Sequence, residues 1–197
     1  PNMSRRPTTY GERRFANFQC LIALRDFLNR HDIPYWLGSG TAVGAYQSGR
    51  YIPWDEDADV DMKIEGWERV KEVLTVDKKN YQVPGPGCLL IDHESFQARK
   101  WLKGVTGRII HDSLGYYNDI FTWGGKEGYY NHYVPTIPDA MLFPVRPCFL
   151  DGVEFACPHR LQEYVEHVYG VDSTLPRFRW DPEKTAFVDP VEGIGKN

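Results

Sequence analysis

The chain has 197 residues, of which 42% are hydrophobic, and a formal net charge of −4 at pH 7. Its 27 acidic and 23 basic residues give no strongly basic surface of the kind that duplex nucleic acid requires. No apolar run approaches the roughly 20 residues that span a bilayer. We therefore expect one domain over residues 1–197, with no nucleic-acid partner and no membrane span in this chain.

The first half of the chain predicts alternating helices and strands. Apolar residues recur at three- and four-residue intervals over 11–31, which predicts a helix. The residues of its apolar face are Phe15, Phe18, Leu21, Ile22, Leu24, Phe27 and Leu28. The short aromatic strand Tyr35–Leu37 follows, then a turn and a helix over 41–47. Polar and apolar residues alternate over 58–64, which predicts a half-buried strand, and a helix follows over 66–74.

The second half is richer in short strands. Strand-like segments occupy 88–92, 96–102, 107–111 and 116–121, and a hairpin over 147–156 precedes a helix over 159–168. The stretch 124–147 is rich in Gly, Pro and Tyr, and it predicts a long loop or a small subdomain. A Pro-rich tail occupies 171–197, after a core of about 14–170. This order predicts an α+β fold, with a mixed sheet flanked by helices.

Four cysteines leave two possibilities open. Cys148 and Cys157 flank the turn of the predicted hairpin, so they could form a disulfide in an oxidising compartment. Two buried free thiols satisfy the same pattern. Neither Cys20 nor Cys88 belongs to a CxxC pair or to a zinc-finger spacing.

An acidic run carries the strongest chemical signal. Asp57 and Asp59 are two residues apart on a predicted strand, so their side chains leave one face roughly 7 Å apart. Two such carboxylates can converge on a divalent cation, and hard oxygen ligands favour Mg²⁺ or Mn²⁺. The alternative is a solvated acidic loop. The alternation of Val60 and Met62 after the run favours a strand over such a loop.

A glycine turn precedes the helix that leads to this run. Gly38, Ser39, Gly40 and Thr41 stand between a predicted strand and a predicted helix. Backbone N–H groups at a helix N-terminus bind phosphate, and glycine permits close approach. We therefore expect residues 38–41 to bind a donor phosphate, although a plain strand-to-helix turn has the same pattern.

Asp119 lies in an otherwise aromatic, strand-like stretch, and a buried carboxylate needs a partner. It is either the third carboxylate of the metal site or one half of a salt bridge to Arg99, Lys100 or Arg108. A diphosphate donor also requires at least one basic contact. Arg108 and Arg50 are the candidates for that contact.

These pieces together resemble the LicD family, which includes the fukutin-related proteins and has the nucleotidyltransferase fold. The resemblance lies in residues 35–45, 52–59, 118–121, 142–153 and 164–170. The chain departs from the family in having Asp61 and Ser39 where Gly is frequent, and it shows none of the cysteine-rich zinc insertion that the fukutin-related proteins carry.

The resemblance implies a nucleotidyltransferase-like sheet with Asp57, Asp59 and Asp119 as catalytic metal ligands. It also implies transfer of a phosphorylated alcohol, such as choline phosphate or ribitol phosphate, from a CDP-linked donor to a glycan, releasing CMP. The compartment would be the Golgi lumen for an animal member and the cytoplasm for a bacterial one. Two alternatives are an Asp-x-Asp glycosyltransferase that uses a nucleotide-sugar, and a non-catalytic glycan- or nucleotide-binding domain.

Overall fold

The computed structural model describes residues 10–52, 55, 57–74, 81–82, 87–92, 105–124, 137–175, 179–181 and 186–188. Its helices are α1 (Tyr10–Arg30), α2 (Ser39–Ser48), α3 (Ile64–Val73), α4 (Asp139–Leu142), α5 (Leu161–Tyr169) and the 3-10 helix η1 (Val171–Thr174). Its strands are β1 (Tyr35–Leu37), β2 (Asp59–Lys63), β3 (Tyr81–Gln82), β4 (Cys88–Asp92), β5 (Val105–His111), β6 (Tyr117–Trp123), β7 (Arg146–Leu150), β8 (Val153–Cys157), β9 (Arg179–Asp181) and β10 (Ala186–Val188).

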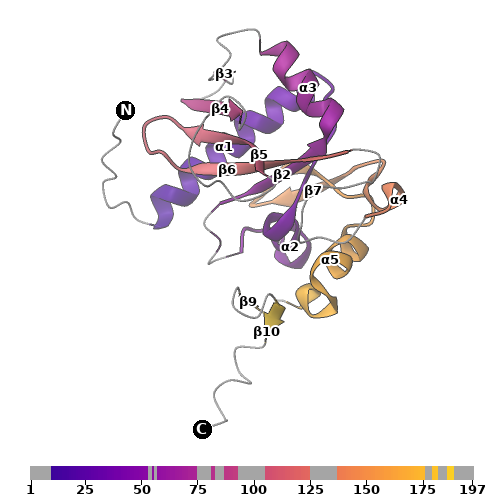
Figure 1. Ribbon diagram of the computed structural model, residues 1–197. Coiled ribbons are helices and arrows are strands. Elements are labelled where there is room, and N and C mark those ends of the chain that lie inside the picture. The colour runs from indigo at the N-terminus through magenta and orange to yellow at the C-terminus, as the bar shows by residue number, and fades with distance from the viewer. Residues whose placement is uncertain are drawn as a thin grey trace.

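A six-stranded mixed sheet forms the centre of the fold (Figure 1). The strand order is β1-β2-β6-β5-β4-β3. Strands β2 and β6 pair in parallel, while the other neighbours in this sheet are antiparallel. The α+β class predicted from the sequence is therefore confirmed.

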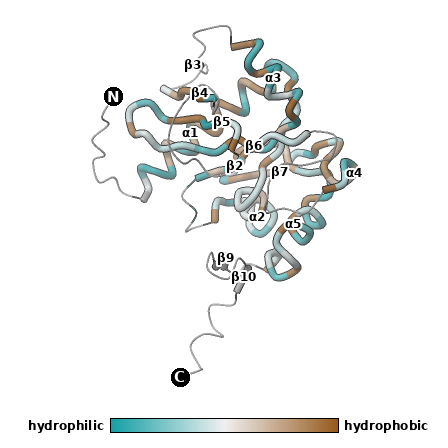
Figure 2. Tube along the Cα trace, in the orientation of Figure 1, coloured by the Kyte–Doolittle hydropathy of each residue, from teal (hydrophilic) through white to brown (hydrophobic). Residues whose placement is uncertain are grey.

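Helices α1 and α3 cover one face of the sheet (Figure 1), and hydrophobic residues recur along these helices and along the strands (Figure 2). Val60 and Met62 of β2 are buried there, together with Leu24 and Leu28 of α1 and Trp67 of α3. Because side chains alternate along a strand, the polar residues of β2 face the other side. This alternation separates the core on the α1 side from the polar residues on the α2 side.

The second face is covered by α2 and α5. Its core is built on Trp36 of β1 and Trp123 of β6, which pack with Val43 of α2 and Val165 of α5. The acidic side chains of β2 begin at the edge of this apolar cluster. This face therefore combines a packed aromatic core with the predicted site.

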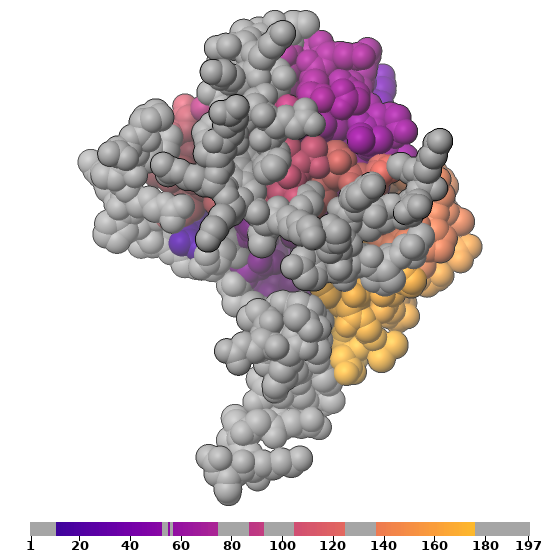
Figure 3. Space-filling model, in the orientation of Figure 1, coloured from indigo at the N-terminus to yellow at the C-terminus, as the bar shows by residue number. Residues whose placement is uncertain are grey.

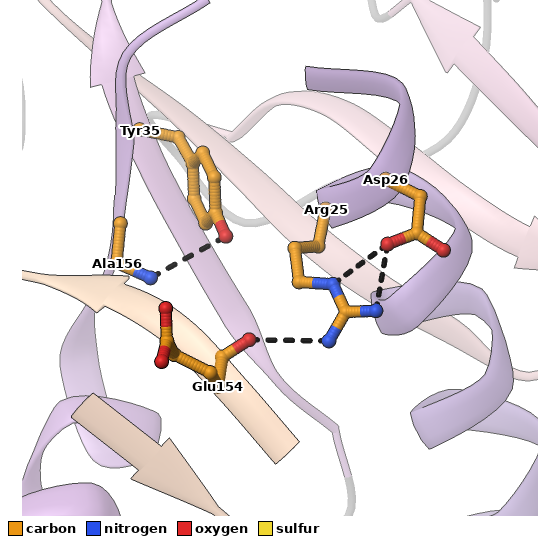
Figure 4. Close-up of polar contacts among 5 residues, drawn as sticks. All are labelled: Arg25, Asp26, Tyr35, Glu154 and Ala156. Atoms are coloured by element: carbon orange, nitrogen blue, oxygen red, sulfur yellow. Dashed lines mark hydrogen bonds and ion pairs between the residues drawn. The ribbon is translucent and has the colours of Figure 1, made fainter. Parts of the chain in front are cut away.

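The β7–β8 hairpin attaches to the first face through α1 and β1 (Figure 4). The Tyr35 hydroxyl accepts a hydrogen bond from the Ala156 N–H at 3.4 Å, and the Arg25 guanidinium donates to the Glu154 carbonyl at 3.1 Å. Arg25 also pairs with Asp26. The hairpin therefore packs against the main sheet as an additional layer.

Both pairs of cysteines are bridged. Cys148 and Cys157 form a disulfide across the hairpin, which decides between the two possibilities that the sequence left open. Cys20 of α1 and Cys88 of β4 form a second disulfide, which the sequence reasoning did not predict. This second bridge joins a helix to the sheet that it covers.

Most predicted elements are present with small shifts, and a few predictions are wrong. Helix α3 begins at Ile64, where a strand residue was predicted, and Phe15, predicted on the apolar face of α1, is 63% exposed. The predicted loop over 124–147 contains α4 in its described part. The predicted strand over 96–102 lies outside the described residues. Among the residues that the structure describes, no helix is both long and apolar enough to cross a membrane.

Candidate active site

Three chain segments meet where β2 begins. Asp59 is the Cα partner of Asp119 in the parallel pair of β2 and β6. The Gly38 N–H, just beyond the end of β1, donates to the Asp59 carbonyl at 3.0 Å. The glycine turn and two of the three predicted carboxylates, Asp59 and Asp119, are therefore brought together where β1 ends and β2 begins.

The backbone of the acidic run is held by Asn118. Its side-chain oxygen accepts a hydrogen bond from the Ala58 N–H at 3.0 Å, and its side-chain nitrogen donates to the Asn17 carbonyl of α1 at 2.8 Å. Asn118 is fully buried, and the next residue, Asp119, donates its N–H to the Ala58 carbonyl at 3.0 Å. Asn118 thus fixes the segment that carries both acidic side chains. The sequence reasoning missed it, although an amide in a buried aromatic strand was a usable signal.

Asp57 does not lie on the strand. Strand β2 begins at Asp59, and Asp57 occupies a bend before it. The prediction that both carboxylates leave one face of a strand is therefore wrong for Asp57. The reason is a long-range pairing: Ala58 forms its hydrogen bonds with Asn118 and Asp119 of β6, and the chain turns on the N-terminal side of Ala58.

Thr41 links α2 to the acidic strand. Its side-chain oxygen accepts a hydrogen bond from the Asp59 N–H at 2.8 Å, and the residue is 1% exposed. Thr41 therefore orients Asp59. Its predicted contact with a donor phosphate remains a prediction.

The glycines of the turn permit close approach by carboxylates. A Cβ atom on Gly38 would stand 2.4 Å from Oδ1 of Asp61, and one on Gly40 would stand 2.6 Å from Oδ2 of Asp55. Ser39, between them, has a φ of 42°, a left-handed conformation that costs a non-glycine residue on the order of 1 kcal/mol or more. The turn is thus packed against acidic side chains on both sides of a strained residue.

The acidic cluster perturbs Asp59 strongly. Burial raises the pKa of Asp59 well above its ordinary value, and the neighbouring charges of Asp57, Asp55, Asp119 and Asp61 raise this pKa further. Carboxylates that repel one another in this way are stabilised by a proton or by a cation. This is the electrostatic condition of a cation-binding site.

Asp119 is paired with Arg108. The guanidinium donates from Nε to Oδ1 at 2.5 Å and from the second nitrogen to Oδ2 at 3.3 Å, and it stacks on the Tyr117 ring at 3.9 Å. Asp119 is 1% exposed, so burial raises its pKa, and Arg108 opposes that rise. The salt bridge considered from the sequence is therefore present, with Arg108 as the partner.

Arg50 lies away from these residues. It follows α2 at its C-terminal end and is exposed. A ten-residue helix is about 15 Å long, so this length separates Arg50 from the turn at residues 38–41. Its predicted contact with a donor phosphate remains a prediction.

Asp61 occupies a buried aromatic pocket under the turn. It is 3% exposed, and the Tyr164 hydroxyl donates to its Oδ2 at 3.5 Å. Burial raises the pKa of Asp61 to about 7, while the hydrogen bond from Tyr164 opposes the rise. Since Gly38 closes the pocket, Asp61 supports the turn rather than facing a ligand.

The donor set suits Mg²⁺ or Mn²⁺ in chemical type, because the cluster offers hard carboxylate oxygens. Within the described part of the chain, no three acidic, His or Cys side chains stand close enough to hold an ion as placed. Asp119 is turned toward Arg108. Binding of an ion to all three predicted ligands therefore requires a rearrangement from the described arrangement.

Part of this chain is similar in sequence to known proteins. The matched segment is 34% identical over 65 residues to the lipopolysaccharide cholinephosphotransferase LicD of Haemophilus influenzae, covering 33% of this chain and 24% of that protein. It is 28% identical over 64 residues to the uncharacterized protein RP689 of Rickettsia prowazekii, covering 32% of this chain and 24% of that protein. The matched stretches thus span about a quarter of each relative.

The crystal structure of ANT(2")-Ia in complex with adenylyl-2"-tobramycin is 13% identical, with a TM-score of 0.43 over 77% of this chain and 68% of that chain. The family described as LicD/FKTN/FKRP, nucleotidyltransferase domain, matches residues 32–160, well over half of the chain. This range contains the glycine turn, the acidic run, Arg108 and Asp119. The chain therefore belongs to the LicD/FKTN/FKRP family, as its sequence resemblance predicted.

Proposed function

We propose that this chain is a phosphotransferase that moves a phosphorylated alcohol, of the choline phosphate or ribitol phosphate type, from a CDP-linked donor to a glycan hydroxyl. The observation that carries the proposal is the register of Asp59 with Asp119 beside the Gly38 turn. Family membership and the similarity to a cholinephosphotransferase support the reaction class.

In the proposed reaction, the acceptor hydroxyl oxygen attacks the phosphorus that carries the alcohol. A new P–O bond forms to the glycan, the P–O bond to CMP breaks, and the hydroxyl proton passes to a nearby carboxylate. Such a transfer depends on alignment and on charge stabilisation more than on a covalent nucleophile. Asp57, Asp59 and Asp119 would hold Mg²⁺ or Mn²⁺, which supplies that charge stabilisation when bound.

The chain's own residues would bind and orient the donor. The N–H groups at the start of α2, in Ser39, Gly40 and Thr41, would contact the donor phosphate, because the first N–H groups of a helix lack partners within it. Thr41 would orient Asp59 toward the same phosphate, because the Thr41 side-chain oxygen accepts a hydrogen bond from the Asp59 N–H.

Arg108 would have one role in the protein without donor and another when donor and cation are bound. Without donor it neutralises Asp119. When Asp119 turns toward a cation, the guanidinium is left beside the site, where its planar donors suit a phosphate. This exchange keeps one positive charge close to Asp119 in each state.

The test measures nucleotide release in the presence of Mn²⁺ and a glycan acceptor: CMP from CDP-choline, CDP-ribitol and CDP-glycerol, and UDP from a UDP-sugar. We expect CMP release from at least one CDP-alcohol, and none from the Asp59→Asn variant. The matched control is Asp139→Asn, which removes a carboxylate that is 76% exposed, and it should retain activity.

Two outcomes would contradict the proposal. Turnover of the UDP-sugar alone would indicate a glycosyltransferase. Binding of nucleotide or glycan without turnover of any donor, under conditions where the fold is intact, would indicate a non-catalytic binding domain.

A further inference from the structure

One buried side-chain amide links the acidic run to helix α1. The Asn118 side-chain oxygen accepts from the Ala58 N–H at 3.0 Å, and its side-chain nitrogen donates to the Asn17 carbonyl at 2.8 Å. An amide has one accepting end and one donating end, so the acceptor in α1 decides where Asn118 presents its oxygen. Since Ala58 stands between the predicted ligands Asp57 and Asp59, α1 reaches the centre of the acidic run through this side chain.

The link lies in the interior of the protein. Asn118 and Ala58 are both 0% exposed, whereas α3 and α5 lie at the surface in Figure 3, in magenta and orange-yellow. A buried N–H without a partner is costly, so the segment around Ala58 would shift if Asn118 no longer accepted its hydrogen bond. Asn118 is thus placed to act on the position of Ala58 and not on a substrate.

A covalent bond fixes α1 at this point. Cys20 lies three residues after Asn17, so the two residues share one face of the helix. Cys20 forms a disulfide with Cys88 of β4, and β4 and β6 are the two neighbours of β5 in the sheet. Within one helical turn, α1 is therefore tied to β4 by the bridge and to β6 by the hydrogen bond to Asn118.

The acidic run is a segment that requires such support. Burial and the neighbouring charges of Asp57 and Asp55 raise the pKa of Asp59, because the carboxylates repel one another. Two carboxylates converge on a cation only where the backbone holds them together against this repulsion, and a displacement on the order of 1 Å is enough to impair a metal site. The position of Ala58 sets how Asp57 and Asp59 approach each other.

We propose that Asn118 is a positioning residue of the metal site, which holds Ala58 at a place set by α1. The Cys20–Cys88 bridge fixes α1 at that place, so the affinity of the site for a divalent cation depends on a disulfide outside the acidic run. This inference rests on the proposed function, because it assumes that the acidic run binds such a cation. It adds α1 and β4 to a site that the sequence placed on α2, β2 and β6.

The test measures Mn²⁺ affinity by titration calorimetry in the wild type, Asn118→Ser, Cys20→Ser/Cys88→Ser and the combined variant. Serine is too short to contact both partners of Asn118, so Asn118→Ser should weaken Mn²⁺ binding about tenfold. Loss of the bridge should weaken it about threefold, since α1 remains packed on the sheet. Because the bridge acts through Asn118, its loss in the Asn118→Ser background should change affinity by less than about twofold.

Two variants control for lost stability alone. Thr122→Val removes a side-chain hydrogen bond to Thr106, at 2.8 Å, from the strand that carries Asn118. Cys148→Ser/Cys157→Ser opens the other disulfide. Both should lower the Tm and leave Mn²⁺ affinity within about twofold of wild type.

Three results would overturn the inference. One is wild-type Mn²⁺ affinity in folded Asn118→Ser. Another is an equal effect of opening either disulfide, because affinity would then follow stability alone, and this comparison decides the matter if Asn118→Ser does not fold. The third is an equal effect of losing the Cys20–Cys88 bridge with and without Asn118, because the bridge would then act by another route.

The two proposals fail separately. If the wild type binds Mn²⁺ but releases CMP from no CDP-alcohol, the proposed reaction fails while the variants still report on Asn118. If CMP release is observed and Asn118→Ser binds Mn²⁺ normally, only the role of Asn118 fails. A wild type that does not bind Mn²⁺ would contradict both.

Discussion

At the scale of single residues, the stability lost when a basic side chain is removed depends on how deeply its carboxylate partner is buried. Arg108 is the cation bonded to Asp119 through two donors. Replacement of Arg108 by Ala leaves a nearly fully buried carboxylate without its counter-ion. We expect the free energy of unfolding to fall by about 3 kcal/mol, measured by urea denaturation, with part of the loss restored by adding Asp119→Asn.

Arg14→Ala is the control for this prediction. Its ion pair with Asp151 is more exposed, at 29% and 26% for the two side chains, and should contribute about 1 kcal/mol or less. If Arg108→Ala is as stable as wild type but loses turnover, the guanidinium acts mainly on the phosphates, and the structural role argued from the salt bridge is wrong.

Asp61 makes stability depend on pH in the metal-free protein. Burial raises its pKa to about 7 from 3.8, so the folded state binds more protons than the unfolded state between these values. Stability therefore falls as pH rises from about 4 to 7, by an amount on the order of 4 kcal/mol at most. Asp61→Asn should have a Tm close to wild type near pH 4 and a higher Tm above pH 7.

The measurement is the difference in Tm between the two proteins in EDTA across this range. Asp139→Asn, on the surface, should show no such trend. A pH-independent difference for Asp61→Asn would mean that the carboxylate is ionised in the folded state throughout.

The sequence located the acidic residues of the proposed site better than the residues that hold them in place. Asp59 and Asp119 could be found because a carboxylate in a buried strand needs a partner that neutralises it. Asn118 could not be assigned, because its role depends on contacts with Ala58 and Asn17, which are far away in the sequence. Asp57 was misplaced because the start of the strand is set by these same long-range hydrogen bonds.

At the scale of elements, the turn before α2 depends on the absence of a side chain. Gly38 has backbone angles that any residue can adopt. Glycine is needed there because Asp61 occupies the space that a Cβ atom would take. Gly38→Ala should lower the free energy of unfolding by roughly 1–3 kcal/mol through overpacking. It should also weaken CDP binding, since the shift occurs at the donor turn. Thermal denaturation and calorimetry measure the two effects.

Gly66→Ala in α3 is the matched control. A Cβ there would stand 3.4 Å from Ile33, an ordinary contact. Alanine in a helix interior is favoured over glycine by roughly 0.5–1 kcal/mol, so this variant should be as stable as wild type or more stable. Equal stability of Gly38→Ala and wild type would show that the turn can move away from Asp61 at little cost.

Elements with clear periodicity were predicted within a few residues, as α1 and β4 show. The end of β2 was misjudged, because Ile64 continues the alternation of the strand although it begins α3. Strands β9 and β10 were missed within the Pro-rich tail, since three-residue strands carry too little pattern to be recognised.

At the scale of the whole molecule, two disulfides join segments of the described fold. The Cys20–Cys88 bridge closes 68 residues, and the Cys148–Cys157 bridge closes 9. The loop-entropy relation gives about 4 kcal/mol for the first and about 2.5 kcal/mol for the second. We expect the Cys20→Ser/Cys88→Ser variant to lose more stability than Cys148→Ser/Cys157→Ser, as measured by denaturant unfolding.

The bridges also bear on where the chain folds, because disulfides persist in oxidising compartments. Denatured, unreduced protein from such a compartment should resist alkylation at all four cysteines. Modification of four thiols would contradict both pairings. Cysteine spacing could suggest the hairpin bridge, but it could not pair Cys20 with Cys88, since that pairing depends on α1 crossing β4.

We propose that the carboxylates at the start of β2 and in β6 form a divalent metal site for a CDP-linked donor. The most direct measurement is an anomalous difference map from crystals grown with Mn²⁺ and CDP. We expect an Mn²⁺ peak about 2.1 Å from carboxylate oxygens of Asp57 and Asp59, with Asp119 turned toward it and the diphosphate at the start of α2. A map without such a peak, with Asp57 and Asp59 both paired to protein cations, would contradict it.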